Sequence, residues 1–152
     1  MTDIVSTPAT LVSETRSELA RLFSSGRVGD IPDGHGRGTL LLGAGATASR
    51  LAAAACYALW WRGKVVNARR RRLKNILTPL NIQAIAAAVY KQESWVDGAP
   101  CIVLDYSKTS LVAQQIRDEI REIAPGLFLG VVFWGRRHIL DFALDFTQRP
   151  PR

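Results

Sequence analysis

The spacing of apolar positions in the last third of the chain predicts two strands. Residues 127–134 (LFLGVVFW) are apolar almost throughout, which is typical of a central strand buried on both faces. Residues 138–146 alternate apolar and polar side chains, which predicts a half-buried antiparallel strand whose polar face carries Asp141 and Asp145. These carboxylates would lie about 13 Å apart at 3.3 Å per residue, too far for a catalytic dyad, so we interpret them as a solvent-facing edge.

An Asp-Gly pair at residues 97–98 predicts a tight turn between two short strands. The segments on either side, 85–94 and 101–106 (CIVLDY), are rich in strand-forming residues, so we expect them to pair as a hairpin.

Residues 111–123 change to a helical spacing. Thr109 or Ser110 can cap this helix, and Pro125 and Gly126 can end it. Its apolar stripe would be formed by Leu111, Ile116, Ile120 and Ile123. Its solvated face would carry Arg117, Asp118, Glu119, Arg121 and Glu122.

The N-terminal third predicts one helix and one long loop. Residues 1–6 form a tail, and Thr7 caps a helix over 8–25 that ends at Gly26. Residues 27–38 (RVGDIPDGHGRG) are rich in turn-forming residues, which predicts an irregular segment.

Residues 39–61 (TLLLGAGATASRLAAAACYALWW) contain a single charge, Arg50. We interpret 39–42 as a short strand or turn and 47–61 as an Ala-rich helix buried in the core. A membrane-surface helix and a membrane span are the alternatives, and the central charge disfavours the span. The same helix could form a dimer interface, so the oligomeric state stays open.

These elements predict an α+β fold over a single domain, 1–152, with its core at 39–146 and a tail at 147–152. We expect a curved antiparallel sheet or a partly closed small barrel, with the N-terminal helices and helix 111–123 packed on it.

Charge is concentrated in one stretch of the chain. The net charge is +7, and residues 62–74 hold seven basic side chains and no acid. With the preceding tryptophans they form a predicted anion-binding or membrane-docking patch of Trp60, Trp61, Arg62, Lys64, Arg69, Arg70, Arg71, Arg72 and Lys74. The chain lacks a sequence-reading motif, which argues against sequence-specific nucleic-acid binding.

The chain's two cysteines, Cys56 and Cys101, lie in apolar runs and are interpreted as small buried hydrophobes. With only two histidines, neither His nor Cys has zinc spacing, so we expect no metal and no cofactor. The N-terminus does not read as a secretory signal, so we expect a cytoplasmic protein, at most peripheral at the membrane.

No established catalytic motif occurs, and the candidate site residues come from short constellations. Tyr106 and Lys108, between strand 101–106 and the following helix, could bind an anion. Asp105 or His35 could act with Tyr106 in acid–base catalysis. Lone His138 is interpreted as a surface residue. The candidate ligand contacts are Tyr106, Lys108, Arg117, Trp134 and Phe142.

Trp61-Arg62-Gly63-Lys64 reads W-x-G-K and is followed by a basic stretch, the hairpin YKQESWVDG and the ending LFLGVVFWGRRHILDFALDF. This order, over residues 59–146, resembles the small bacterial GxWxG-type proteins with a lipocalin-like look, although Leu59 replaces the first glycine of the motif. The resemblance implies a partly closed antiparallel barrel with an apolar pocket and no catalytic residues to carry over.

The surplus of apolar and aromatic residues on the predicted strands motivates the leading functional hypothesis. It is binding of a small apolar or amphipathic molecule, lipid-like or acidic, in a pocket of the sheet. An isomerase, cyclase or hydrolase using Tyr106, Asp105 or His35 is one alternative. A peripheral membrane-docking or scaffold protein that uses the basic patch is another.

Overall fold

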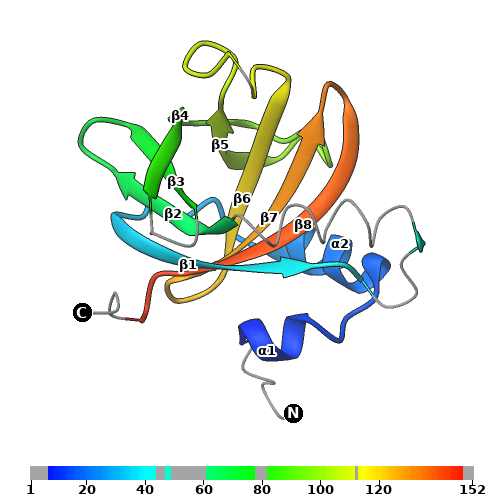
Figure 1. Ribbon diagram of the computed structural model, residues 1–152. Helices are drawn as coiled ribbons and strands as arrows, with labels where there is room; N and C mark the ends of the chain where they lie inside the picture. The colour runs from blue at the N-terminus through cyan, green and yellow to red at the C-terminus, as the bar shows by residue number, and fades with distance from the viewer. Residues whose placement is uncertain (1–6, 44–46, 49–60, 78–81, 112, 149–152) are drawn as a thin grey trace.

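The computed structural model describes residues 7–43, 47–48, 61–77, 82–111 and 113–148 (Figure 1). Eight antiparallel strands follow one another around a closed barrel, and the last strand pairs with the first. The strands are β1 Gly34–Leu41, β2 Trp61–Asn67, β3 Arg72–Leu77, β4 Ile82–Glu93, β5 Pro100–Asp105, β6 Ile116–Ala124, β7 Leu127–Trp134 and β8 Arg137–Asp145. The expected antiparallel sheet is thus confirmed in the form of a small barrel, which is closed and not only partly closed as expected.

Two short helices lie outside the barrel wall (Figure 1). The predicted helix 8–25 is divided into α1 Pro8–Leu11 and α2 Arg16–Ser25, because Thr15 provides a second N-cap after Thr7. Helix α1 contacts β8, and α2 contacts β6 and β7. None of the helices in the described part of the chain has the length and apolar character that a membrane-spanning helix needs.

Several predicted strands are confirmed. Strands β4 and β5 form the expected hairpin around residues 94–99, and β7 and β8 match the predicted strands at 127–134 and 138–146. Cys101 is buried and free, as its apolar setting predicted.

The predicted helix at 111–123 is wrong, because residues 116–124 form strand β6. Inward-facing Ile116 and Ile120 are four residues apart, a spacing that also fits a helix. The outward side chains between them are charged, yet they are covered by other parts of the chain, so the usual alternation of apolar and solvated positions is hidden.

The Gly-rich segment at 27–38 is only partly irregular, since β1 begins at Gly34. Its glycines leave room for aromatic rings inside the barrel. A Cβ added at Gly38 would lie 2.4 Å from the Trp61 ring, and one added at Gly36 would lie 2.6 Å from the Phe146 ring. The predicted Ala-rich helix lies mostly outside the described residues, and its last residue, Trp61, begins β2 instead.

The barrel wall separates two apolar clusters. The inner cluster lies inside the barrel and includes Trp61, Ile120 and Phe142. The outer cluster lies beneath the helices and includes Leu19 and Phe23 of α2. We call the end of the barrel where β1, β3, β5 and β7 finish end A, and the end where they begin end B.

Candidate functional site

A fully buried lysine stands inside the barrel. The side chain of Lys64 is 0% exposed and points inward from β2. Its ammonium lies 2.7 Å from Asn75 Oδ1, 2.6 Å from Tyr106 Oη and 2.9 Å from Asp118 Oδ2. We call Lys64, Asn75, Tyr106 and Asp118 the inner polar cluster.

The four members of the inner polar cluster come from different parts of the barrel wall near end A. Asn75 of β3 is the direct register partner of Lys64 in β2. Asp118 of β6 pairs with Leu104 of β5, and Tyr106 follows the end of β5. Asp118 shares its inward face with Ile116 and Ile120, as expected for alternate residues of one strand.

A strained residue supports this cluster from β4. Ile85 has a φ of +56°, which is unusual for a β-branched side chain, and it lies where the β3–β4 register shifts. The carbonyl of Ile85 accepts a hydrogen bond of 3.3 Å from Asn75 Nδ2. The bulge therefore directs a backbone acceptor at the side chain that holds Lys64.

Aromatic rings surround the Lys64 ammonium. Its Nζ lies 5.5 Å from the ring centre of Trp61, 5.3 Å from that of Tyr106 and 5.4 Å from that of Phe142. Burial lowers the pKa of Lys64 from its ordinary value, and the nearby Asp118 carboxylate opposes this shift. The site thus places an ion pair in an otherwise apolar interior.

The inner polar cluster has an unused acceptor. The three acceptors around Lys64 match the three protons of its ammonium. Asp118 Oδ1, in contrast, is buried without a hydrogen-bond partner among the described residues. Leaving such an atom unpaired is costly, so the position favours a group that donates a hydrogen bond.

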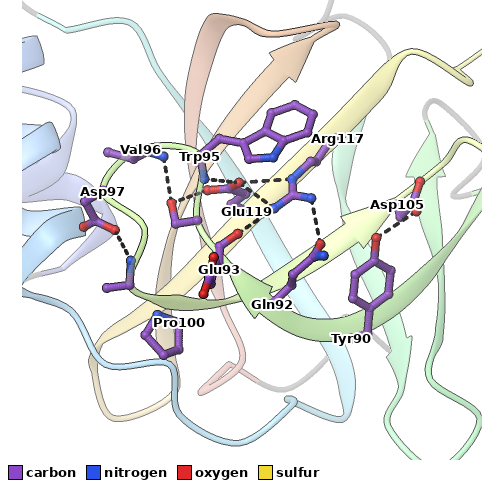
Figure 2. Close-up of polar contacts among 12 residues, drawn as sticks. Tyr90, Gln92, Glu93, Trp95, Val96, Asp97, Pro100, Asp105, Arg117 and Glu119 are labelled. Atoms are coloured by element: carbon purple, nitrogen blue, oxygen red, sulfur yellow. Dashed lines mark hydrogen bonds and ion pairs between the residues drawn. The ribbon is translucent and has the colours of Figure 1, made fainter.

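A second polar network lies on the outer face of the barrel (Figure 2). Glu119 of β6 accepts hydrogen bonds from Ser94 Oγ at 2.5 Å and from the backbone N–H of Trp95 at 2.8 Å. Arg117 donates to Glu119 at 2.9 Å, and its guanidinium lies 4.2 Å from the Trp95 ring centre. This network fastens the β4–β5 turn over β6, which is a structural role.

A third outer group ties α2 to the same turn. The buried Arg121 donates two hydrogen bonds of 2.6 Å to Asp97 and one of 3.1 Å to the carbonyl of Phe23. The bidentate ion pair lowers the pKa of Asp97 to about 2. Arg117 and Arg121 are therefore not on a solvated helix face.

The candidate catalytic residues are not brought together. Tyr106 belongs to the inner polar cluster, whereas Asp105 accepts a hydrogen bond of 2.8 Å from Tyr90 on the outer side. His35 lies in β1, opposite Val65 of β2, and alternates with the inward-facing Gly36. The three therefore do not form one acid–base constellation.

The candidate ligand contacts are also divided. Phe142 joins Tyr106 inside the barrel. Lys108 is exposed in the β5–β6 connection, Trp134 is exposed at the end of β7, and Arg117 lies in the outer network.

Two predicted surface features are buried instead. Lys64 and Trp61 point into the barrel, so neither belongs to an exposed basic patch. The other described basic residues of the patch are exposed, and Trp60 lies outside the described residues. Asp141 and Asp145 do not form a solvent edge, because Asp141 lies 2.5 Å from His138 Nε2 and Asp145 accepts from Thr147.

A cleft of about 400 Å³ lies outside the barrel. It is lined by residues from α1, β1 and the end of β8, including Val12, Arg37 and Asp145. None of its lining residues belongs to the inner polar cluster. Among the described residues, no group of three or more His, Cys, Asp or Glu side chains is placed to hold a metal ion.

Sequence reasoning missed Asn75 and Asp118 as site residues and placed Lys64 on the surface. The alternation in WRGKVVN puts Lys64 and Val66 on one face, which was the available signal. The four consecutive arginines that follow it obscured this pattern. Nothing local marks Asp118, because the residues on both sides of it are charged as well.

Comparison with known proteins shows a similar fold but does not assign the chain to a family. No family model matches the chain, and no curated protein matches it. A crystal structure of a protein from Thermomonospora curvata is similar, with a TM-score of 0.63 and 17% sequence identity, over 92% of this chain and 93% of that one. At this identity the similarity shows a shared barrel architecture across nearly the whole of both chains.

Proposed function

We propose that the barrel binds a small, largely apolar molecule whose polar head donates a hydrogen bond to Asp118. The observation that carries the proposal is the buried Asp118 Oδ1, which has no hydrogen-bond partner among the described residues. An eight-stranded barrel has an interior wide enough for side chains or for one small ligand, as in lipocalins. Trp61 and Phe142, packed edge to face at 5.5 Å, would contact the apolar part of the ligand.

The chemistry of the inner polar cluster favours a hydroxyl or N–H head over an acidic one. A carboxylate or phosphate head would need a hydrogen bond from the Lys64 ammonium. The three N–H groups of that ammonium already have acceptors. An anionic head would also lie close to the Asp118 carboxylate. A neutral donor satisfies Oδ1 without displacing any existing partner, so alcohols, phenols and diarylamines are the proposed ligand class.

Native mass spectrometry of protein purified from cells without detergent tests this proposal. We expect an adduct of small-molecule mass on the wild-type chain and its loss in the double variant K64M/D118L, which removes both charges together. The matched control is D145N, on the outer face, which should keep the adduct. A wild-type chain without an adduct, which also takes up none from a lipid extract, contradicts the proposal.

Acid–base catalysis is a second candidate, favoured by the hydrogen bond of 2.6 Å between Lys64 Nζ and Tyr106 Oη. An amine with a lowered pKa beside a phenol can move a proton at a bound substrate. The two candidates differ in their product. A passive binder returns its ligand unchanged after incubation, whereas an enzyme converts it with a rate that depends on pH.

A further inference from the structure

Two neighbouring loops at end A present exposed apolar and basic side chains together. Leu111 of the β5–β6 connection is 91% exposed, and Trp134 at the end of β7 is 60% exposed. Basic side chains beside them are also exposed. We call this set, formed by Lys108, Leu111, Trp134, Arg136 and Arg137, the tip surface.

The two loops are joined by hydrogen bonds. The backbone N–H of Gly135 donates to the carbonyl of Gln115 at 2.9 Å, and Trp134 Nε1 donates to Gln115 Oε1 at 3.0 Å. The guanidinium of Arg136 is held 4.3 Å from the ring centre of Trp95. The two loops are therefore tied together at Gln115, and the exposed indole of Trp134 is held by a hydrogen bond to it.

The two loops of the tip surface carry basic residues and no acid. The described residues of the β5–β6 and β7–β8 connections, 106–111, 113–115 and 135–136, contain no Asp or Glu. Among the described residues, no ion pair joins Arg136 or Arg137 to an acid. Both guanidiniums are therefore available to an anionic partner.

We propose that the tip surface docks the barrel, end A first, on an anionic lipid membrane. Tryptophan at the rim and an exposed leucine suit the boundary between headgroups and acyl chains, and basic side chains beside them attract acidic headgroups. A nucleic acid would use stacking platforms along a basic groove, and Leu111 has no ring to stack. The proposal is independent of the inner polar cluster and needs no ligand in the barrel.

The chain contains an internal control for plain electrostatic attraction. The turn between β2 and β3, at end B, carries Arg69 and Arg70, which are also exposed. The exposed large apolar side chains among the described residues are Val12, Trp95, Val96, Leu111 and Trp134. None of them belongs to that turn. Removing two arginines from either end changes the net charge equally and leaves the apolar residues of the tip surface in place.

Co-sedimentation with two kinds of vesicle tests the proposal. One kind is pure phosphatidylcholine, and the other contains about 30% phosphatidylserine. We expect binding that requires phosphatidylserine, and we expect R136Q/R137Q to weaken it by roughly 30-fold. L111S/W134S should weaken it by at least tenfold at unchanged net charge. R69Q/R70Q should stay within about threefold of the wild type. Circular dichroism confirms that each variant is folded.

Four results would overturn the proposal. Absence of vesicle binding by the wild-type chain removes it. If R136Q/R137Q and R69Q/R70Q weaken vesicle binding equally, the attraction comes from overall charge alone. If L111S/W134S binds vesicles as tightly as the wild type, no apolar group inserts. Binding of single-stranded RNA that R136Q/R137Q abolishes, without binding to vesicles, assigns the surface to nucleic acid instead.

Discussion

Lys64 Nζ lies 2.9 Å from Asp118 Oδ2, and the two side chains are 0% and 1% exposed. The residues belong to β2 and β6, which are not neighbours in the barrel, so their ion pair crosses its interior. Such a pair needs partners for all its polar atoms to offset the loss of solvation. All three N–H groups of Lys64 have acceptors, whereas Asp118 Oδ1 has no partner among the described residues. The ion pair is therefore weak evidence for a stabilising role and stronger evidence for a binding site.

Removing one member of this ion pair should destabilise the fold more than removing both. We expect K64M or D118L alone to lower the free energy of unfolding by about 3–5 kcal/mol, because each leaves a buried charge unpaired. The double variant K64M/D118L should lie within about 1–2 kcal/mol of the wild type, since two apolar side chains of similar size replace the pair. Urea unfolding of the four proteins measures the coupling energy. Additive losses would show that the two charges do not interact in the native protein.

The lowered pKa of Lys64 makes stability depend on pH below 10.5. Below its native pKa, Lys64 is charged in both the folded and the unfolded chain. Between that pKa and the ordinary value of 10.5, only the unfolded chain retains the proton, so the free energy of unfolding rises with pH. The wild type should therefore gain stability relative to K64M/D118L as pH rises toward 10.5. A relative loss over the same interval would mean that the Asp118 carboxylate outweighs burial.

The Asp97–Arg121 ion pair gives stability a dependence on acid pH, and there too the free energy of unfolding rises with pH. Because the pKa of Asp97 is lowered from 3.8 to about 2, its stabilisation is complete above 3.8 and is lost as pH falls through 2. At neutral pH, D97N should cost about 1–2 kcal/mol, a value reduced because the side chain is 25% exposed. The difference between wild type and D97N should shrink below pH 4 in thermal unfolding. A constant difference across that range would assign the effect to packing of the turn.

The inward-facing Gly130 leaves space for the Phe142 ring. A Cβ added there would lie 2.2 Å from Phe142 Cζ. We expect G130A to lower the free energy of unfolding by about 1–3 kcal/mol through overpacking. The smaller side chain in G130A/F142L should recover part of the loss, as measured by the urea midpoint. Equal stability of G130A and the wild type would show that the ring moves away freely.

Sequence patterns predicted the strands that are marked by their own alternation or by a turn directly beside them in the chain. The Asp97–Gly98 turn predicted the hairpin of β4 and β5, and strict alternation predicted β8. Strand β6 was missed because its outward side chains are charged and yet covered, by α2 and by the β4–β5 turn. The covering groups lie far away in the sequence.

The candidate site was harder to predict than the fold for a similar reason. Tyr106 was identified from its place after a strand, but its partners Lys64 and Asp118 lie 42 and 12 residues away. Their convergence depends on barrel closure, which local spacing does not encode. The glycines of β1 resembled a loop because the rings of Trp61 and Phe146 that fill their space are remote.

Two fluorescent probes that differ in one hydrogen-bond donor test directly whether Asp118 accepts a hydrogen bond from a ligand in the barrel. N-phenyl-1-naphthylamine carries one N–H, and its N-methyl derivative carries none. We predict that the wild-type barrel binds the N–H probe at least tenfold more tightly, because only that probe satisfies Asp118 Oδ1, and that K64M/D118L loses this preference. Equal affinity for the two probes, or no binding of either, would contradict the proposal that the barrel binds a donor-headed apolar molecule.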